Sequence, residues 1–590
     1  ISLDTQMDPA WIETLGSDEW TIPMVHTAQV IIDPRIETGM KHSHDYLQMD
    51  KVMSDLKYAN KKLHVPLHTR AMLRSPLAPM FFGALKKELD SLNKLGTWSC
   101  MKCPRGTRPV GSRFVYDIKW DLENDVLDKF KARLIAQGCS QVAYDTYDPN
   151  QISSPVMKAS SMNAICIIAA KLGLRLHTLD VKNAYITAKL DEKIFIRLPS
   201  FLKVTVDGKI TMDSNIVQLN KALYGLKNSS SAWFAELKTF LLSIGFVQSN
   251  QDPCVFTYIG EHGACILGTH VDDILSASTE DFFEKYLLPK ATKYFPFGVT
   301  HGSARQFLGC MIDQDLEKGE VSISQKERIE KIAEMFNVKR SKNTPFPTGE
   351  ELIKTFAVES LSDTDEKQNK TVQNINDDKD LPNFTSYKEV RTYYRSYTGN
   401  LVYMCCYGRP DIQAIVYRLA RYQESPSIKH IMAVRRIISY LLHTKTRKLI
   451  FGRQRMDETL SSFSDSSFAD CPASGRSTGG YCHFLFGSYL ASRSFKMNCV
   501  TRSVTEAEFY TMSACAADSI YFRNLFNETL RPVLLHCEKI DSVAGKSSML
   551  SNKVDCVPIV HSDKKEFAEI LLSKSIHPFQ WMHEEDTVIY

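Results

Sequence analysis

The sequence predicts an α+β protein of several domains. Its 590 residues correspond to about two to four domains of ordinary size. Hydrophobic residues make up 43% of the chain, which is enough for real cores. Stretches with the 3.6-residue period of helices alternate with stretches that have the two-residue period of strands. Helices and strands therefore follow one another along the whole chain.

Bulk composition excludes some classes of protein. The 72 basic and 68 acidic residues give a net charge of +4, which is too balanced to establish a nucleic-acid partner. The 15 cysteines form no disulfide framework, so we expect reduced and mostly packed thiols. No apolar run approaches the roughly 20 residues that span a bilayer, and no signal peptide follows Ile1. We expect a piece released from a longer polypeptide that does not enter a membrane.

The N-terminal part predicts a linker, a helix and a hairpin. Residues 1–78 are weakly periodic, which favours a linker or the tail of an upstream module. From Met80, apolar residues recur at helical spacing until Gly96, which predicts an amphipathic helix with a glycine stop. Residues 110–120 and 130–136 alternate like the strands of a hairpin. Basic side chains on this hairpin suit phosphate contacts, and a solvated charged edge is the alternative.

Three later stretches carry candidate chemistry. A mostly apolar helix over 159–174 leads into a strand that ends at Asp180. The stretch LYGLK follows at 223–227, and Asp272 and Asp273 then lie between two apolar runs that predict a hairpin. Adjacent acids at a turn are most often solvated, but close carboxylates repel unless a cation lies between them. Acids brought together by a sheet suit two Mg²⁺ ions about 4 Å apart, the arrangement used in phosphoryl transfer.

Six short motifs occur in a fixed order along the chain. They read KARLIAQG at 131–138, LDVKNAY at 179–185, LYGLK at 223–227, VDD at 271–273, FLG at 307–309 and RPDI at 409–412. Together they resemble the reverse transcriptase–ribonuclease H region of the Pol polyprotein of copia-type LTR retrotransposons. The resemblance runs from about residue 85 to the C-terminus.

The resemblance implies a right-hand polymerase of fingers, palm and thumb, followed by a ribonuclease H-like α/β domain. The palm acids Asp180, Asp272 and Asp273 would be catalytic and would hold two Mg²⁺ ions, with Mn²⁺ as an alternative. The implied domains are a linker or upstream tail at 1–78, fingers and palm at 79–348, an acidic and polar linker at 349–384, a helical thumb or connection at 385–455, and a shortened ribonuclease H-like domain at 456–590.

The resemblance also implies residues that contact the substrates. Tyr185 would crowd the ribose 2′-OH and favour dNTPs, because that hydroxyl distinguishes the two sugars. His270 stands where the family usually has Tyr or Phe, which we expect to weaken placement of the primer end. The implied dNTP-binding residues are Lys131, Arg133, Tyr185, Tyr224 and Gly225, and the implied primer-positioning residues are His270, Phe307, Leu308 and Gly309.

The C-terminal part resembles a ribonuclease H domain with an altered carboxylate set. Asp465 and Glu508 match the first two metal ligands, and Glu538 takes the third position, with Asp541 as the alternative. Glu569 takes a fourth catalytic position that is usually Asp. A longer carboxylate shifts its oxygens, which two-metal geometry tolerates poorly. Because the interval from Glu538 to Glu569 is also short, we predict weak or absent ribonuclease H activity on an intact fold core.

The predicted function is RNA-directed DNA polymerisation by primer extension with dNTPs. The implied partners are an RNA or DNA template with its primer, an RNA–DNA hybrid, dNTPs, and the integrase and capsid products of the same element, with no membrane. The implied location is a cytoplasmic virus-like particle, with the nucleus as a second location. Two alternatives are a degenerate or repurposed copy that binds nucleic acid without polymerising, and a structural interaction protein.

Overall fold

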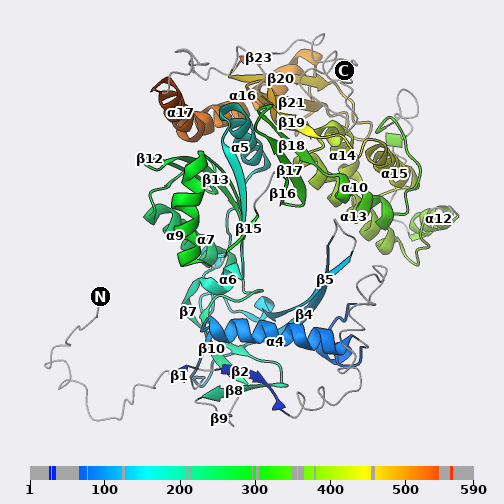
Figure 1. The fold of residues 1–590 in the computed structure, drawn as a ribbon. Coiled ribbons are helices and arrows are strands. Elements are labelled where there is room, and N and C mark those ends of the chain that lie inside the picture. The colour runs from blue at the N-terminus through cyan, green and yellow to red at the C-terminus, as the bar shows by residue number, and fades with distance from the viewer. Residues whose placement is uncertain are drawn as a thin grey trace. The chain divides into compact units, whose positions relative to one another are not determined.

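The chain folds into two units, each assembled from segments that are distant in the sequence. Unit 1 comprises residues 1–154 and 185–236, and unit 2 comprises residues 155–184 and 237–590. The segment predicted as one polymerase domain, 79–348, therefore contributes to both units. The structure is a computed structural model (Figure 1) and describes residues 26–27, 29–34, 65–75, 77–101, 103–121, 126–206, 209–210, 215–295, 297–300, 304–346, 355–356, 365–377, 381–452, 459–543 and 559–561.

Unit 1 is built on a six-stranded sheet in the order β1-β3-β10-β7-β4-β5 (Figure 1). The predicted basic hairpin is confirmed, since β4 and β5 pair antiparallel with Phe114 opposite Leu134. A small sheet of β2, β8 and β9 completes the strands described in this unit. The strands are β1 (His26–Thr27), β2 (Gln29–Ile32), β3 (Trp98–Cys100), β4 (Val110–Asp121), β5 (Val126–Ala136), β7 (Lys189–Arg197), β8 (Leu202–Val206), β9 (Lys209–Ile210) and β10 (Ile216–Lys221).

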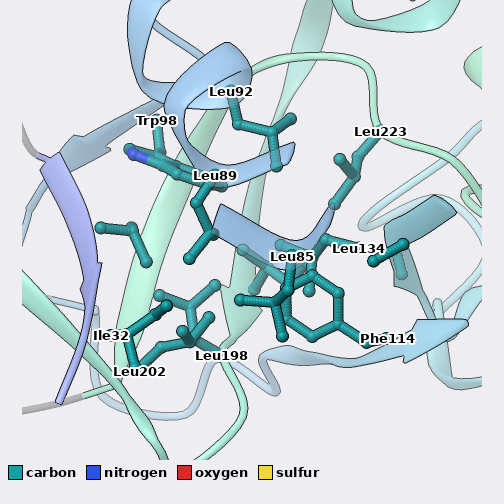
Figure 2. Close-up of a cluster of buried hydrophobic side chains, with 14 of the residues drawn as sticks. Ile32, Leu85, Leu89, Leu92, Trp98, Phe114, Leu134, Leu198, Leu202 and Leu223 are labelled. Carbon is teal, nitrogen blue, oxygen red and sulfur yellow. The ribbon is translucent and has the colours of Figure 1, made fainter. Parts of the chain in front are cut away.

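The core of unit 1 joins a long helix to this sheet. The helix predicted from Met80 is confirmed as α4 (Ala78–Lys94), and Gly96 just beyond it has φ +64°. Leu85, Leu89 and Leu92 of α4 are buried among Trp98 and side chains of the sheet (Figure 2). Burying each such leucine stabilises the fold by about 1.5–3 kcal/mol. The short helix α3 (Thr69–Met72) precedes α4, and α6 (Ala184–Thr187) begins the second segment of the unit.

Unit 2 begins with a sheet in the order β11-β12-β13-β14-β6-β15. The helix predicted over 159–174 is confirmed as α5 (Ala159–Leu172), which is buried almost throughout and ends at Gly173 with φ +66°. This sheet carries the three acids predicted to hold metal. The elements of this part are β6 (Arg175–Val181), β11 (Val247–Gln248), β12 (Val255–Gly260), β13 (Gly263–His270), β14 (Asp273–Ser278), α8 (Glu280–Phe282), α9 (Leu288–Tyr294) and β15 (Phe297–Thr300), and helix α7 (Ser229–Ser243) has residues in both units.

A second sheet and a helical cluster follow in unit 2. The predicted linker at 349–384 differs from the structure, because residues 365–376 form a helix, α12. Ile375 is fully buried in the helical cluster, and the Asn376 amide hydrogen-bonds both backbone groups of Phe384. The elements are β16 (Ala304–Phe307), β17 (Cys310–Asp315), β18 (Glu320–Ser324), α10 (Lys326–Met335), α12 (Asp365–Asn376), α13 (Tyr387–Cys406), α14 (Gln413–Leu419), α15 (Ile428–His443) and β19 (Leu449–Phe451).

The last part of unit 2 is a four-stranded sheet in the order β22-β21-β20-β23 with two helices. The two strands predicted over 477–492 are confirmed as β21 and β22, which pair antiparallel. Helix α5 also packs on β22, where the Asn163 amide donates to the Leu490 carbonyl at 3.0 Å. The elements are β20 (Leu460–Ser467), β21 (Thr478–Leu485), β22 (Ser488–Lys496), α16 (Val504–Leu525), α17 (Arg531–Val543) and β23 (Ile559–His561). Within the described part of the chain, no helix combines the length and apolarity needed to cross a bilayer.

Candidate active site

The predicted Asp-Asp hairpin is present and its turn is strained. Strands β13 and β14 pair antiparallel, with His270 opposite Asp273 and only Val271 and Asp272 between them. Val271 has φ +60°, as the first central residue of a type II′ turn requires. A β-branched residue in this region costs about 1–3 kcal/mol. The turn thus stores strain beside the two acids.

Strand pairing brings the third acid to the same place. Strand β6 pairs antiparallel with β14 so that Asp180 lies opposite Asp273. The Val181 amide donates to the Asp272 carbonyl at 3.0 Å, which ties the turn to the end of β6. Burial, together with the negative charges of Asp272 and Asp180, raises the pKa of Asp273 to about 6. The three carboxylates are therefore close enough to repel one another.

This donor set fits a divalent cation chemically. Carboxylate oxygens are the hard ligands that Mg²⁺ prefers, and a cation between the acids would remove the repulsion that raises the pKa of Asp273. In the conformation described, no three His, Cys, Asp or Glu side chains among the described residues are arranged to hold a metal ion. Asp180 and Asp272 are exposed, so their side chains are open to a ligand from solvent.

His270 lies beside the acids as a half-buried ring. Burial lowers the pKa of His270, against a hydrogen bond to the Met157 backbone and the charge of Asp272. The ring is therefore neutral at physiological pH. In this position it adds no positive charge to the carboxylate cluster.

The predicted nucleotide-binding residues are brought together in unit 1. The Arg133 guanidinium on β5 lies 5.4 Å from the centre of the Tyr224 ring. The Tyr185 ring meets Tyr224 edge-on with centroids 5.3 Å apart, and the Tyr185 hydroxyl accepts from Ser230 Oγ at 3.4 Å. Burial lowers the pKa of Lys131, and the charge of Arg133 lowers it further, so β5 presents concentrated positive charge. A triphosphate would relieve that repulsion.

Two glycines allow the loops of this cluster to touch. The Ala136 amide donates to the Tyr224 carbonyl at 2.7 Å. A Cβ on Gly225, which has φ +89°, would lie 2.2 Å from the Ala136 carbonyl oxygen. A Cβ on Gly138 would lie 2.3 Å from the Gly225 carbonyl oxygen. The motifs at 131–138 and 223–227 thus form one packed feature that only glycine permits.

The predicted primer-positioning turn connects β16 and β17 in unit 2. Phe307 pairs with Cys310, and Leu308 and Gly309 form the two-residue turn. Both turn residues have positive φ, at +48° and +67°, as in a type I′ turn. Phe307 is 1% exposed, so its side chain packs in the protein interior.

The part of the chain predicted to resemble ribonuclease H brings two predicted acids onto adjacent elements. Asp465 lies on β20 and Glu508 on α16, and α16 packs across β20. A Cβ on Gly479 would lie 2.6 Å from Thr511 Oγ1, so this glycine allows the close approach of α16 to β21. Both acids are half-buried.

The predicted third acid, Glu538, lies on a helix. Glu538 and its alternative Asp541 lie on helix α17, while the strand that pairs with β20 is β23, in parallel. In that register Phe463 lies opposite His561. Asp465 is two residues beyond Phe463, and Asp563 is two residues beyond His561. Asp563 and Glu569 lie outside the described residues.

Comparison with known proteins gives the class of this chain. Residues 95–350 match the family model "Reverse transcriptase (RNA-dependent DNA polymerase)". The motifs, the carboxylate cluster and this match agree, so the chain carries a reverse transcriptase domain.

Relatives among transposon polyproteins cover most of the chain. It is 28% identical over 523 residues to the Retrovirus-related Pol polyprotein from transposon TNT 1-94 of Nicotiana tabacum, covering 88% of this chain and 36% of the relative. The Pol polyprotein from transposon RE1 of Arabidopsis thaliana is 26% identical, with 82% and 30% covered. The predicted relationship to copia-type retrotransposon Pol polyproteins is confirmed, and the chain spans about a third of these relatives' length.

A yeast relative and one solved structure extend the comparison. The Truncated transposon Ty1-A Gag-Pol polyprotein of Saccharomyces cerevisiae is 25% identical over 451 residues, covering 73% of this chain and 34% of the relative. A foamy viral protease–reverse transcriptase in complex with double-stranded DNA aligns with 12% identity and a TM-score of 0.30, over 86% of this chain and 84% of that chain. A TM-score this low does not define a common fold.

Proposed function

We propose that this chain extends a primer with dNTPs on an RNA or DNA template, as the reverse transcriptase of a copia-type element. The observation that carries the proposal is the carboxylate cluster of Asp180, Asp272 and Asp273 on paired strands. In this proposal unit 1 contributes the fingers, the sheet of β6, β13 and β14 is the palm, and α10 with α12–α15 forms the thumb and connection.

The proposed mechanism assigns separate tasks to the residues. Asp180, Asp272 and Asp273 would hold two Mg²⁺ ions, and the neutral His270 beside them leaves that negative charge uncompensated. Such ions, when bound, would activate the primer 3′-OH and stabilise the leaving oxygen. Lys131 and Arg133 would contact the triphosphate. Catalysis is then mainly positioning and electrostatic stabilisation.

The test is primer extension on an RNA template with Mg²⁺. Replacing Asp272 and Asp273 together with Asn should lower extension by roughly a hundredfold or more. Asp281→Asn is the matched control, because Asp281 is an exposed acid in unit 2 whose partner is Lys285, and it should leave extension unchanged. The competing function is a decayed copy that binds nucleic acid without polymerising. Binding of a hybrid that weakens with salt, without extension by the unmutated chain, would favour that copy.

We also propose that Asp465, Glu508 and Asp563 form the carboxylate set of a ribonuclease H site. The parallel register of β20 and β23 supports this set, because it places Phe463 opposite His561, and Asp465 and Asp563 each follow two positions later in the sequence. Asp563→Asn should abolish cleavage of a labelled RNA–DNA hybrid, while Glu538→Gln should retain it. If cleavage is lost in Glu538→Gln and retained in Asp563→Asn, Glu538 is the third acid instead. No cleavage by the unmutated chain would contradict this site and match the expectation of an impaired domain.

A further inference from the structure

Three elements of unit 2 converge on the tip of the β16–β17 hairpin. Arg328 is in the first turn of α10, and Tyr403 lies in the last part of α13. A Cβ built on Gly309 would lie 3.3 Å from Arg328 Nη1 and 3.4 Å from the Tyr403 hydroxyl. The turn therefore presents its backbone directly to a cation and a phenol from two distant segments.

Arg328 stacks on an aromatic ring and forms no ion pair with an acid among the residues that the structure describes. Its guanidinium lies over the Tyr403 ring, 3.8 Å from the ring centre. Its Nε is buried, and no hydrogen-bond acceptor meets it in the described part of the chain. Stacking on a ring fixes the guanidinium plane and leaves its in-plane N–H groups available as donors. A buried donor without a partner is costly, so this arrangement favours a bound acceptor.

The charge of one acid of the carboxylate cluster acts on the Tyr403 phenol. Burial raises the pKa of the Tyr403 phenol, and the charges of Cys310, Tyr407 and Asp273 raise it further, against the opposing charge of Arg328. The Tyr403 side chain is thus within electrostatic reach of Asp273.

An open cavity of about 410 Å³ adjoins the hairpin tip. Gly309 and Arg328 line it together with Lys326, Lys448 and the acids Asp313 and Glu327. Because both signs of charge are present, net charge does not select the ligand. The fixed donors of Arg328 select an acceptor with two adjacent oxygens, which is the geometry of a phosphodiester.

We propose that Arg328, oriented by Tyr403, binds the 3′-terminal phosphodiester of the primer at the Leu308-Gly309 turn. This inference rests on the proposed function. Arg328 donates to the two non-bridging oxygens of the phosphodiester. Tyr403 is a positioning residue that acts through the guanidinium.

The experiment pairs an enzyme variant with a substrate variant. Arg328→Gln and the unmutated full chain extend two primers, one ordinary and one with a neutral methylphosphonate at the 3′-terminal linkage. On the ordinary primer Arg328→Gln should lower kcat/KM by about 10- to 100-fold, the effect of one charge-assisted contact. Changing from the ordinary to the neutral primer should lower the kcat/KM of the unmutated chain by a similar factor. The same change of primer should lower the kcat/KM of Arg328→Gln by less than about threefold. Lys331→Gln, an exposed cation on the same helix outside the cavity, should behave as the unmutated chain does.

Other outcomes overturn the inference. Equal extension of the ordinary primer by Arg328→Gln and the unmutated chain would refute it. Equal loss in both proteins when the linkage is neutralised would assign Arg328 a structural role only. Arg328→Lys should recover part of the loss, and Tyr403→Phe, which keeps the ring, should recover more than Tyr403→Leu.

A second readout separates this inference from the proposed function. If the unmutated chain extends neither primer, fluorescence anisotropy with both primers annealed to template measures binding alone. The neutral linkage should weaken primer binding by the unmutated chain and leave binding by Arg328→Gln unchanged. That result would support the phosphodiester contact even in a chain that does not polymerise. The same loss in both proteins would refute the contact.

Discussion

Replacing Gly225 by Ala should separate the two loops that hold the nucleotide-binding side chains. The added Cβ would lie 2.2 Å from the Ala136 carbonyl oxygen and 2.5 Å from Ile135 Cγ2, and φ +89° is unfavourable for any residue but glycine. The backbone conformation alone costs about 1–3 kcal/mol. Moving the loop also weakens the 2.7 Å hydrogen bond from the Ala136 amide to the Tyr224 carbonyl, worth about 0.5–1.5 kcal/mol. We expect the free energy of unfolding of unit 1 to fall by roughly 2–4 kcal/mol in total.

The functional consequence follows from the position of Tyr224. Its ring contacts both Arg133 and Tyr185, so a displaced loop disturbs the whole cluster. Steady-state extension with a varied dNTP should show a KM raised by about tenfold or more. Gly83→Ala is the control, since Gly83 lies inside α4 with nothing within 4 Å of an added Cβ. That change should stabilise the protein by about 0.5–1 kcal/mol. An unchanged dNTP KM and unfolding midpoint in Gly225→Ala would refute the close-packing argument.

Three further predictions concern stability. Val271→Gly should raise the free energy of unfolding by about 1 kcal/mol by relieving φ +60°, and a lower urea midpoint would contradict this. Asp411→Asn should lower the free energy of unfolding by about 3–5 kcal/mol, because Arg409 is 1% exposed and paired to Asp411 at 2.9 Å. Faster hydrogen exchange across α13 and α15 would show the loss. Burial lowers the pKa of His430 and of His483 to about 4, below the unfolded value of about 6.5. Their stabilisation is complete above pH 6.5 and is lost, up to about 3 kcal/mol each, as pH falls toward 4. His430→Gln should reduce the loss of stability between pH 6.5 and 4. An unchanged profile of unfolding free energy against pH would refute the contribution of His430.

Local sequence pattern predicted the elements well where one period dominates. Alternation identified β4 and β5, and continuous apolarity identified α5, because each pattern reflects a single environment along the element. The pattern failed at 365–376, where a largely polar stretch forms α12. A few buried contacts, such as Ile375, stabilise that helix, and composition does not reveal them.

The candidate site residues also divide into those that a local motif identifies and those that only tertiary contacts reveal. The acids Asp180, Asp272 and Asp273 were identified by motif order, but whether they meet depended on the β6–β14 register. Glu538 was predicted from its place after apolar residues, and the structure places it on helix α17. Arg328 and Tyr403 carry no motif, and they meet only because α10 and α13 pack at one hairpin tip.

By itself, the sequence determined the class of this protein, the order of most of its elements and the candidate metal-binding acids. These properties are local, because periodicity and short motifs are set by neighbouring residues. The tertiary structure alone decided which acids face each other, which glycines permit loop contact, and which distant arginine and tyrosine meet beside the turn. Those contacts depend on strand register and helix packing between segments far apart in the chain, which no local pattern encodes.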